Sequence, residues 1–472
     1  MLFISDEFFL FLLLVLGTLA VVRHTEWRRW ILLGFCVWFY ASWSWKFLGL
    51  LFANILVDYV LALKMGDTDD PRLRKRYVTL SVCMNLGMLG FFKYLGFGAG
   101  VLNDGLTLLG TGWKVPVPHL ILPLGISFYV FQAISYTVDI YRGLLKPTRS
   151  LRELATFIMF FPHLVSGPIV RAAEILPQLE RLKEPLQADE IMKGARDFVI
   201  GFGRKVVFAD QFALLADATF GAPGAYGSLD LVVGLGAYGL QIYFDFSGYS
   251  QMAVGLARMF GIHFPDNFDT PYVARSLQEF WRRWHISLSR FLRDYLYIPL
   301  GGSRHGLGRT MFALAATMLI GGFWHGANWT FVVWGGIHGV GQAIAYLYKE
   351  WRPSSHVAFW ESRAGDLLGW VLTQGTVFLA WIFFRATTVE GSLAYLGRMV
   401  SGAVGTAALA VTPLQVALFG LAVGIHLVAY LRPAWEVPWP RRALAQGLAV
   451  GAVYVALVAM KQADAPFIYF NF

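Results

Sequence analysis

The chain has 472 residues, of which 57% are hydrophobic, 16% aromatic and only 15% charged. Soluble proteins carry about 25% charged residues, so this composition excludes a soluble globular enzyme and predicts an all-α polytopic membrane protein. The formal net charge of +9 does not indicate a nucleic-acid partner, because the basic residues lie in loops between apolar runs, where they set the orientation of membrane helices.

Uncharged or nearly uncharged runs recur along the chain. A helix of about 20 apolar residues crosses a bilayer, so the runs predict about eleven transmembrane helices, together with buried re-entrant pieces. The polar segment at residues 171–197 predicts an amphipathic helix on the cytoplasmic surface. The runs are Phe8–Val22, Trp30–Trp45, Phe47–Leu63, Tyr77–Phe92, Leu120–Val138, Leu154–Val170, Leu231–Phe244, Thr310–Tyr348, Leu367–Phe384, Met399–Leu431 and Ala443–Met460.

Basic clusters follow the first, third and fifth of these runs. With the N-terminus outside, these clusters fall on the cytoplasmic side, as the positive-inside rule requires. The first run follows an acidic start and has no basic lead-in, so we expect it to remain as a membrane anchor rather than to be removed as a signal peptide. The two cysteines, Cys36 and Cys83, lie in apolar runs and are expected to be core residues.

The segment from Gln241 to Arg309 mixes Arg, Asp, Trp, Tyr and His at a density unsuited to lipid contact. Charged groups near membrane depth need partners or a water-filled cavity, so we expect this segment to line a funnel open to the cytoplasm. Helical spacing places His285, Leu288, Ser289 and Leu292 on one face, with Trp281 one turn earlier. For Asp245, a buried salt bridge with an arginine of residues 280–294 is predicted.

Three arginines of this segment, Arg282, Arg283 and Arg290, have two interpretations. Guanidinium groups match phosphate geometry, so they could hold a phosphate-bearing donor. They could equally anchor the cytoplasmic side of the membrane helices. The spacing by itself does not separate the two.

His325 lies within the uncharged run Thr310–Tyr348, which is long enough for two passes. An ionisable residue at membrane depth is a candidate functional residue, and imidazole suits proton transfer near neutral pH. The alternative is a structural histidine that hydrogen-bonds between helices. The neighbouring Gly321, Gly322 and Gly326 predict a loosened helix and close approach of a ligand. We expect His338 to bond between helices and His163 to be structural.

Several ordered motifs match a known family. They are FFPHLVSGPIVR, IYFDFSGYSQMAVGLARMFGI, NFDTPY, SLQEFWRRWHISLSRFLRDYLYIPLGG, GGFWHGANWTFVVWGGIHG, WIFFRA and the terminal FIYFNF. With these motifs the chain resembles the membrane-bound O-acyltransferase (MBOAT) family. The resemblance is strong from about Leu120 to Phe472. Within the family, the chain is most similar to the branch whose members O-acetylate polysaccharides such as alginate.

The resemblance implies a fold and a site. It implies that His325 is the catalytic histidine, that His285 is the second motif histidine, and that a narrow central tunnel links a cytoplasmic donor to an extracytoplasmic acceptor. Trp324 and Asn328 beside His325, and the three arginines, are candidate donor contacts. We therefore expect N-terminal transmembrane helices over residues 1–119, a catalytic core over 120–349 and C-terminal transmembrane helices over 350–472.

The predicted activity is O-acyl transfer across an inner membrane, with the chain as a multi-pass protein among membrane lipids. The expected donor is acetyl-CoA or a similar acyl thioester, with His325 as general base or transient acyl acceptor. The resemblance implies a periplasmic acetyltransferase partner and a polysaccharide as final acceptor. No Walker loop, HExxH, GxSxG or metal-ligand cluster appears, so no bound cofactor or metal is expected.

Other functions stay open. Within the family, peptidoglycan or cellulose O-acetylation and D-alanyl transfer to teichoic acid are alternatives to alginate acetylation. Outside it, a transporter or a scaffold of a polysaccharide-export complex would have the same hydropathy. Consumption of a thioester separates an enzyme from both.

Overall fold

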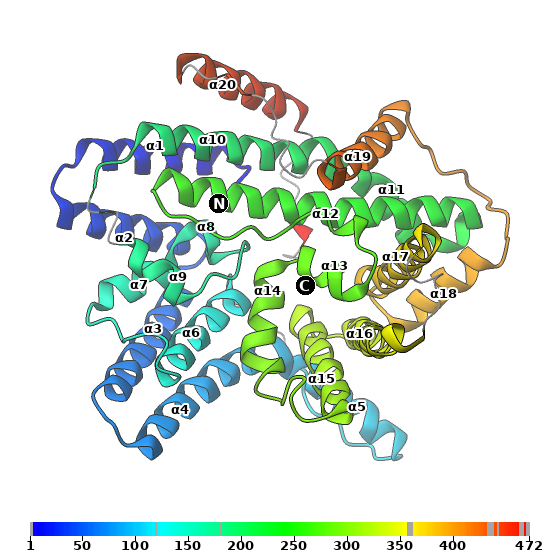
Figure 1. Cartoon of the computed structure of the whole chain (residues 1–472), viewed down its shortest axis with the longest axis horizontal. Coiled ribbons are helices and arrows are strands. Elements are labelled where there is room, and N and C mark those ends of the chain that lie inside the picture. The colour runs from blue at the N-terminus through cyan, green and yellow to red at the C-terminus, as the bar shows by residue number, and fades with distance from the viewer. Residues whose placement is uncertain are drawn as a thin grey trace. The chain divides into compact units, whose positions relative to one another are not determined.

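The computed structural model describes residues 3–118, 120–179, 182, 184–355, 362–431, 439–440, 443–461 and 467–468. These residues form helices, turns and loops without a strand, which confirms the all-α prediction (Figure 1). The chain divides into two compact units, residues 1–199 with 250–265 and residues 200–249 with 266–472. The three functional regions bounded at residues 119 and 349 stay a prediction.

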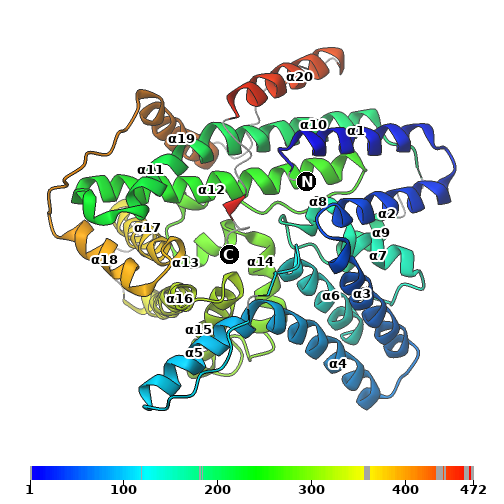
Figure 2. The same cartoon turned by 180° about the vertical axis from the view of Figure 1, so that it is seen from behind.

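The first unit contains helices joined mostly by short connections. Helices α3, α4 and α6 lie side by side (Figure 2). Its elements are α1 (Asp6–Val21), α2 (Thr25–Ala41), α3 (Trp45–Gly66), α4 (Pro71–Leu89), the π-helix η1 (Gly90–Tyr94), α5 (Leu95–Leu108), α6 (Ile126–Tyr141), α7 (Leu151–Met159), α8 (Phe161–Leu164), α9 (Ala172–Leu179) and most of α10 (Ala188–Gly203).

A buried polar network joins α3, α4 and α6. Asp58 is fully buried and accepts hydrogen bonds from Ser81 Oγ at 2.5 Å and from Asn85 Nδ2 at 2.9 Å. Ser81 also bonds Thr137 on α6 at 2.9 Å, and Asn85 accepts from Asn54 on α3 at 3.1 Å. Side-chain hydrogen bonds of this kind hold membrane helices together, because apolar contact with lipid is as favourable as apolar contact between helices.

The run Leu154–Val170 does not form one long helix. It folds into α7 and α8, which are separated at Phe160 and followed by extended chain, and every residue from 154 to 170 is buried. Pro162, at the start of α8, lacks the backbone N–H that a continuous helix would need. A segment of this form is compatible with a re-entrant piece inside protein.

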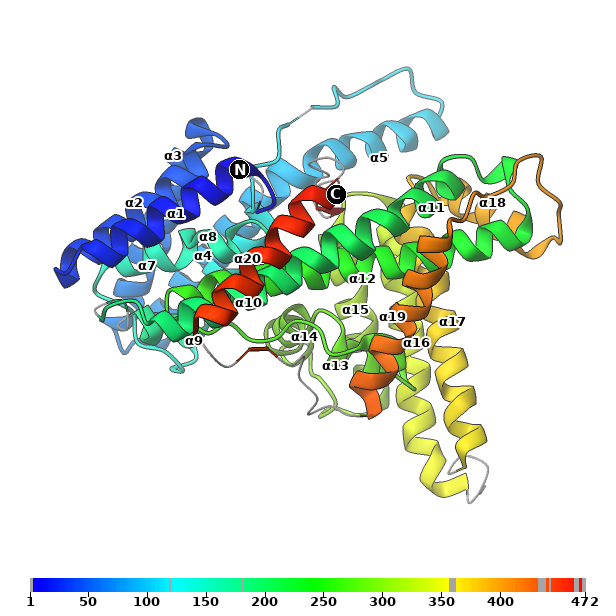
Figure 3. The same cartoon turned by 90° about the horizontal axis from the view of Figure 1, so that it is seen from above.

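The second unit holds the histidines of interest. Helices α15 and α16 pack closely, and α16 runs beside α17 (Figure 3). Its elements are η3 (Arg204–Ala209, π), α11 (Asp210–Gly221), η4 (Pro223–Ala225, 3₁₀), α12 (Ser228–Met259, shared with the first unit), η5 (Pro271–Val273, 3₁₀), α13 (Leu277–Arg283), α14 (Ile286–Leu292), η6 (Arg293–Tyr297, π), α15 (Leu307–His325), α16 (Trp329–Ser355), α17 (Arg363–Arg385), α18 (Val389–Val400), α19 (Pro413–Leu431) and α20 (Ala443–Met460).

Side-chain caps fix the starts of helices in both units. The Ser276 hydroxyl accepts from the N–H of Glu279 at the start of α13, and Ser362 accepts from Gly365 at the start of α17. In the first unit, Asp70 caps α4 immediately before Pro71. These residue types are the ones that satisfy the open N–H groups of a first turn.

Among the described residues, five helices are long and apolar enough to cross a membrane. The total of about eleven spans is therefore not confirmed. One reason is visible in the run Leu120–Val138, where Gly125 adopts φ +70° and the helix begins only at Ile126. The five candidates are Trp45–Gly66, Pro71–Leu108, Leu307–His325, Arg363–Arg385 and Pro413–Leu431.

Two further predictions need correction. Cys36 is buried, but Cys83 is exposed, because α4 buries Val78, Ser81 and Asn85 on its other face. The polar segment at 171–197 forms two helices, α9 and the start of α10, instead of one. Hydropathy measures how apolar a run is, and it does not say which face of the helix meets protein.

Glycines allow the close contact of α15 with α16. A Cβ at Gly335 would lie 2.5 Å from the Met318 carbonyl oxygen, whereas one at Gly336 would meet only Leu319 Cδ2 at 3.8 Å. We expect Gly335→Ala to destabilise the fold by about 1–3 kcal/mol through overpacking, and Gly336→Ala to be neutral. Thermal unfolding in detergent measures both; equal melting temperatures would contradict the packing seen here.

Candidate active site

The predicted continuous helix across His285 is wrong. Helix α13 ends at Arg283 and α14 begins at Ile286, and His285 between them has φ +43°. Among the described residues, the non-glycine positions with positive φ are Thr270 and His285, and both lie in the segment 266–294. Such backbone costs on the order of 1–3 kcal/mol and persists only where surroundings impose it, often at functional sites.

Asn267 imposes this conformation. Its side-chain oxygen Oδ1 accepts from Nδ1 of His285 at 3.2 Å, from the N–H of Ser287 at 3.1 Å and from Oγ of Ser287 at 2.8 Å. Its main-chain carbonyl accepts from the N–H of Ile286 at 3.0 Å. The backbone turn between the two helices is therefore tied to one buried amide side chain.

The Asn267 bond also selects the tautomer of His285. An amide oxygen only accepts, so Nδ1 carries the hydrogen and Nε2 carries the lone pair. Nε2 is buried and has no hydrogen-bond partner among the described residues. His285 lies outside the five candidate spans, and burial lowers its pKa to about 3, so the ring is neutral at physiological pH and Nε2 can accept a hydrogen bond.

His325 is the last residue of α15 and its side chain is nearly enclosed, with 4% of the residue exposed. Three aromatic rings surround it, with centroids 5.0 Å away for Trp324, 5.1 Å for Trp334 and 5.2 Å for Phe384. An imidazole in an aromatic enclosure meets little water, which strengthens its electrostatic interactions with a reacting group.

The prediction that the glycines near His325 loosen its helix is wrong. These glycines allow close packing instead. Gly321 and Gly322 lie inside regular α15, which continues to His325. A Cβ at Gly322 would lie 2.4 Å from the Phe331 carbonyl oxygen, and one at Gly326 would lie 2.1 Å from the Phe331 ring. The helix ends because Gly326 turns to extended backbone, and only a residue without a side chain fits there.

Asn328, a candidate contact of the acyl donor, has a structural role. Its Oδ1 accepts from the N–H of Thr330, which caps the start of α16, and its Nδ2 donates to the Thr387 carbonyl at 2.7 Å. These bonds fix the turn after His325 relative to the end of α17. Trp324 contributes its ring to the enclosure of His325.

His338 is the interhelical hydrogen-bonder that the sequence predicted. The indole N–H of Trp281 on α13 donates to Nδ1 of His338 on α16 at 3.3 Å. The His338 ring also lies 4.7 Å from Trp334 and 6.2 Å from Phe280, which stacks on Trp284 at 5.6 Å. A continuous set of ring contacts therefore leads from His325 to Trp284, the residue before His285.

His163, in the first unit, also has a structural role. It is fully buried, and its Nε2 lies 2.8 Å from the carbonyl oxygen of Phe157, to which it donates. The bond ties α8 back to α7.

The three arginines differ in their surroundings. Arg283 is engaged with Asp269 and Glu279, each at 3.0 Å. Arg282 is exposed on α13 and has no ion pair with the described residues. Arg290 lies half-buried on α14. Of the three, Arg282 has the guanidinium most available to a phosphate.

Asp245 does form a buried salt bridge, but the predicted arginine partner is wrong. Nζ of Lys205 lies 2.8 Å from Asp245 and 2.9 Å from Asp210. Asp245 Oδ2 also accepts from the N–H of Ile468 at 2.7 Å. The π-helix η3 carries Lys205, and π-helical turns often mark functional positions.

Phe467 lies in the surroundings of His285. The ring of Phe467 lies 5.5 Å from Phe246, and Phe246 lies edge-on to His285 at 4.6 Å. No pattern in the sequence links Phe467, in FIYFNF, with Phe246, in IYFDFSGYS.

Comparisons with known proteins show the family of this chain. A model of MBOAT, the membrane-bound O-acyltransferase family, matches residues 145–385. The probable alginate O-acetylase of Azotobacter vinelandii is 42% identical over 398 residues, which cover 83% of this chain and 76% of the relative. The corresponding protein of Pseudomonas aeruginosa is 41% identical, over 91% of this chain and 80% of its own length.

The chain belongs to the membrane-bound O-acyltransferase family. It is therefore a multi-pass membrane protein and an O-acyltransferase. The peptidoglycan O-acetyltransferase of Helicobacter pylori is also similar, at 38% identity over 79% of this chain and 73% of the relative. The matched segment contains both His285 and His325 and the residues that position them.

The positioning of His285 in this acyltransferase can be tested at Asn267. Asn267→Ala removes three hydrogen bonds, so we expect a loss of about 1–3 kcal/mol for the groups left unpaired, together with reduced acyl transfer. Asn267→Asp keeps the acceptor oxygen and should retain part of the stability and part of the acyl-transfer rate. Ser287→Ala, which removes a single bond, serves as the control. Equal activity of Asn267→Ala and Ser287→Ala would contradict the positioning role.

The buried charges of the acyltransferase predict an asymmetry. Lys205→Met leaves two carboxylates without their shared cation, and loss of one partner of a buried pair costs roughly 3–5 kcal/mol. Asp245→Asn leaves Lys205 paired with Asp210 and should cost less. Thermal unfolding in detergent compares the two. A melting temperature lower for Asp245→Asn than for Lys205→Met would refute this account.

Proposed function

We propose that this O-acyltransferase moves an acetyl group from a cytoplasmic thioester, acetyl-CoA or a close relative, toward an extracytoplasmic polysaccharide such as alginate. The observation that carries the proposal is the enclosure of His325 by three aromatic rings at the end of α15. The names of the relatives from Azotobacter and Pseudomonas support acetyl as the acyl group and alginate as the polymer.

The chemistry assigned to His325 is general base catalysis or transient acyl transfer. As a base, a ring nitrogen takes the proton of an incoming hydroxyl while its oxygen attacks the thioester carbonyl. The C–S bond breaks, and the thiolate leaves with that proton. As an acyl acceptor, the imidazole holds the acetyl group between the two halves of the reaction. The dry surroundings favour transfer over hydrolysis.

His285 is proposed as the second histidine of the site. Its Nε2 lone pair has no partner among the described residues, so it is able to accept a hydrogen bond from a hydroxyl or amide of a substrate. The bond to Asn267 keeps the ring in this tautomer. We assign it to orientation of a substrate, with His325 at the reacting carbon.

The donor is proposed to bind from the cytoplasm. Arg282 is the leading phosphate contact because it is exposed and makes no ion pair with the described residues. Arg283, Arg290, Trp324 and Asn328 remain candidate contacts. The donor acts as a substrate, and the proposed mechanism uses no bound cofactor or metal.

The location proposed is the inner membrane, with the N-terminus outside and the basic loops in the cytoplasm. The basic clusters after the first, third and fifth apolar runs support this orientation. A narrow central tunnel would pass an acetyl group while the charged donor and the polymer stay on opposite sides. A periplasmic acetyltransferase partner is proposed to place the acetyl group on the polysaccharide.

Peptidoglycan is the second candidate polymer, because the Helicobacter pylori relative is a peptidoglycan O-acetyltransferase. D-alanyl transfer to teichoic acid has weaker support, because the relatives of that name match 55% and 50% of this chain. Cellulose acetylation and a transporter or scaffold role in polysaccharide export have no such relative in their favour.

The test uses the purified protein in lipid nanodiscs with radiolabelled acetyl-CoA, a candidate periplasmic partner, and alginate or peptidoglycan fragments. We expect label on the partner or polymer, and we expect His325→Ala to lower the rate about 100-fold or more, as loss of a general base does. His305→Ala, which removes an exposed histidine, should keep the wild-type rate.

The polymer that gains label decides between alginate and peptidoglycan. Acetyl transfer at the wild-type rate by a folded His325→Ala protein would contradict the role assigned to His325. Absence of label with every acceptor, beside a working positive control, would refute acetyl-CoA as the donor.

A further inference from the structure

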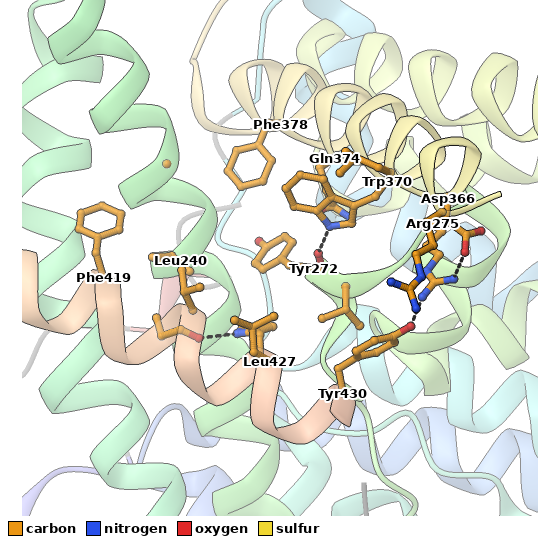
Figure 4. A pocket seen from close by; sticks show the side chains of 17 residues that line it. Leu240, Tyr272, Arg275, Asp366, Trp370, Gln374, Phe378, Phe419, Leu427 and Tyr430 are labelled. Carbon is orange, nitrogen blue, oxygen red and sulfur yellow. Dashed lines mark hydrogen bonds and ion pairs between the residues drawn. The ribbon is translucent and has the colours of Figure 1, made fainter. Parts of the chain in front are cut away.

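A cavity lies in the second unit, on its α17 and α19 helices. Its volume is about 700 Å³, and it is lined mainly by side chains of α17, α19, α12 and η5 (Figure 4). We call it the α17–α19 groove. Both α17 and α19 are candidate membrane spans, and Val423 and Leu427 at the groove are more than half exposed. The groove therefore opens where membrane lipid would contact the protein.

One end of the groove is apolar. Leu240, Phe378 and Phe419 line it (Figure 4). This part of the cavity matches an alkyl chain, since burial of methylene groups against such side chains is favourable.

The other end carries charge. Arg275 pairs with Asp366 at 2.6 Å and also bonds the Tyr430 hydroxyl. Arg363 lines the groove three residues, or about one helical turn, before Asp366 and has no ion pair with the described residues. Two guanidinium groups against one carboxylate leave this end with a net positive charge, which suits a phosphate.

Between the two ends lie two polar side chains with unused acceptors. Gln374 and His426 are 7% and 6% exposed, so both are more than nine-tenths buried. Gln374 donates from Nε2 to the Ala274 carbonyl, and His426 donates from Nδ1 to the Ala422 carbonyl, each at 2.9 Å. That leaves Gln374 Oε1 and the His426 Nε2 lone pair without a partner among the described residues. Both line the groove.

The occupant must therefore bring a hydrogen-bond donor, because an unpaired buried acceptor costs about 1–3 kcal/mol. His426 lies one helical turn, or about 6 Å, from Tyr430, whose hydroxyl bonds Arg275. The hydrogen-bond donor of the occupant is thus expected between its anionic group and its alkyl chain.

We propose that the α17–α19 groove binds a lipid with one acyl chain, a free hydroxyl where chain and head meet, and a phosphate in its head. A monoacyl glycerophospholipid has these features in this order. A diacyl lipid fits less well, because its second ester replaces this hydroxyl and places an acceptor where the two protein acceptors need a donor. This inference concerns a site apart from His325 and does not depend on the proposed function.

Occupancy of the groove is expected to brace the candidate active site. The Tyr272 ring lies 5.7 Å from His426 and 6.2 Å from Trp284, the residue before His285. The Tyr272 hydroxyl also donates to the Gly239 carbonyl at 2.5 Å. A bound lipid would thus contact residues that pack directly on the turn holding His285.

The test measures lipid binding to the purified full chain by native mass spectrometry and thermal shift. The probes are oleoyl lysophosphatidylglycerol, the same lipid with its junction hydroxyl methylated, and dioleoyl phosphatidylglycerol. We expect one tightly bound lysolipid per chain and binding at least tenfold weaker for the other two. Equal binding of all three would overturn the proposal and indicate ordinary annular lipid.

Variants locate the site. His426→Phe keeps a ring against Tyr272 but removes the acceptor, so the preference for the free hydroxyl should shrink severalfold. Arg363→Gln should weaken binding of all three phosphate lipids. Leu421→Ala, at an exposed α19 residue outside the groove, is the matched control. An undiminished preference in a folded His426→Phe protein would overturn the assignment, and the lipid comparison on the unaltered chain stands if that variant fails to fold.

Discussion

The side chain of Asn267 is the constraint on which the candidate active site depends. One amide oxygen holds the imidazole of His285, the N–H of Ser287 and its hydroxyl. These bonds are made only if His285 adopts left-handed backbone, which few non-glycine residues do. The backbone strain at His285 is offset because the buried oxygen of Asn267 would otherwise lack hydrogen-bond partners. The same bonds decide which ring nitrogen of His285 is free to meet a substrate.

Buried charge around this site is balanced locally. Lys205 lies between the carboxylates of Asp210 and Asp245, and the backbone N–H of Ile468 adds a further donor to Asp245. An uncompensated charge at such a position would cost several kcal/mol. The arrangement ties the π-helix η3, helix α12 and the end of the chain together. It also brings Phe467 against Phe246, which contacts His285.

An aromatic wall connects the α17–α19 groove with the surroundings of His325. Rings of Trp284 and Trp381, with centroids 5.0 Å apart, connect Tyr272 at the α17–α19 groove with Phe384 beside His325. Large flat side chains fill space with few rotatable bonds, so they transmit position well. Such a wall separates His325 from the α17–α19 groove and joins the packing around the two.

Hydropathy and motif order by themselves determined the class of this protein. An all-α membrane protein and the O-acyltransferase family follow from runs of apolar residues and from motifs contiguous in the chain. The same motifs single out His285 and His325 as candidate site residues. The roles assigned to the two histidines remain proposals. The helix count did not follow, because a run of apolar residues such as Leu154–Val170 also forms short buried helices broken by proline.

Only the tertiary structure decided which groups pair in the buried ion pairs and hydrogen bonds. The sequence predicts an arginine of residues 280–294 as the partner of Asp245, yet the partner is Lys205. The fold brings η3 against α12 although α11 and η4 lie between them in the chain. The sequence likewise suggests one helix through His285, where Asn267 instead stabilises a turn. Local propensity acts over a few residues, whereas a buried hydrogen bond or ion pair forms with whichever group the fold brings within reach.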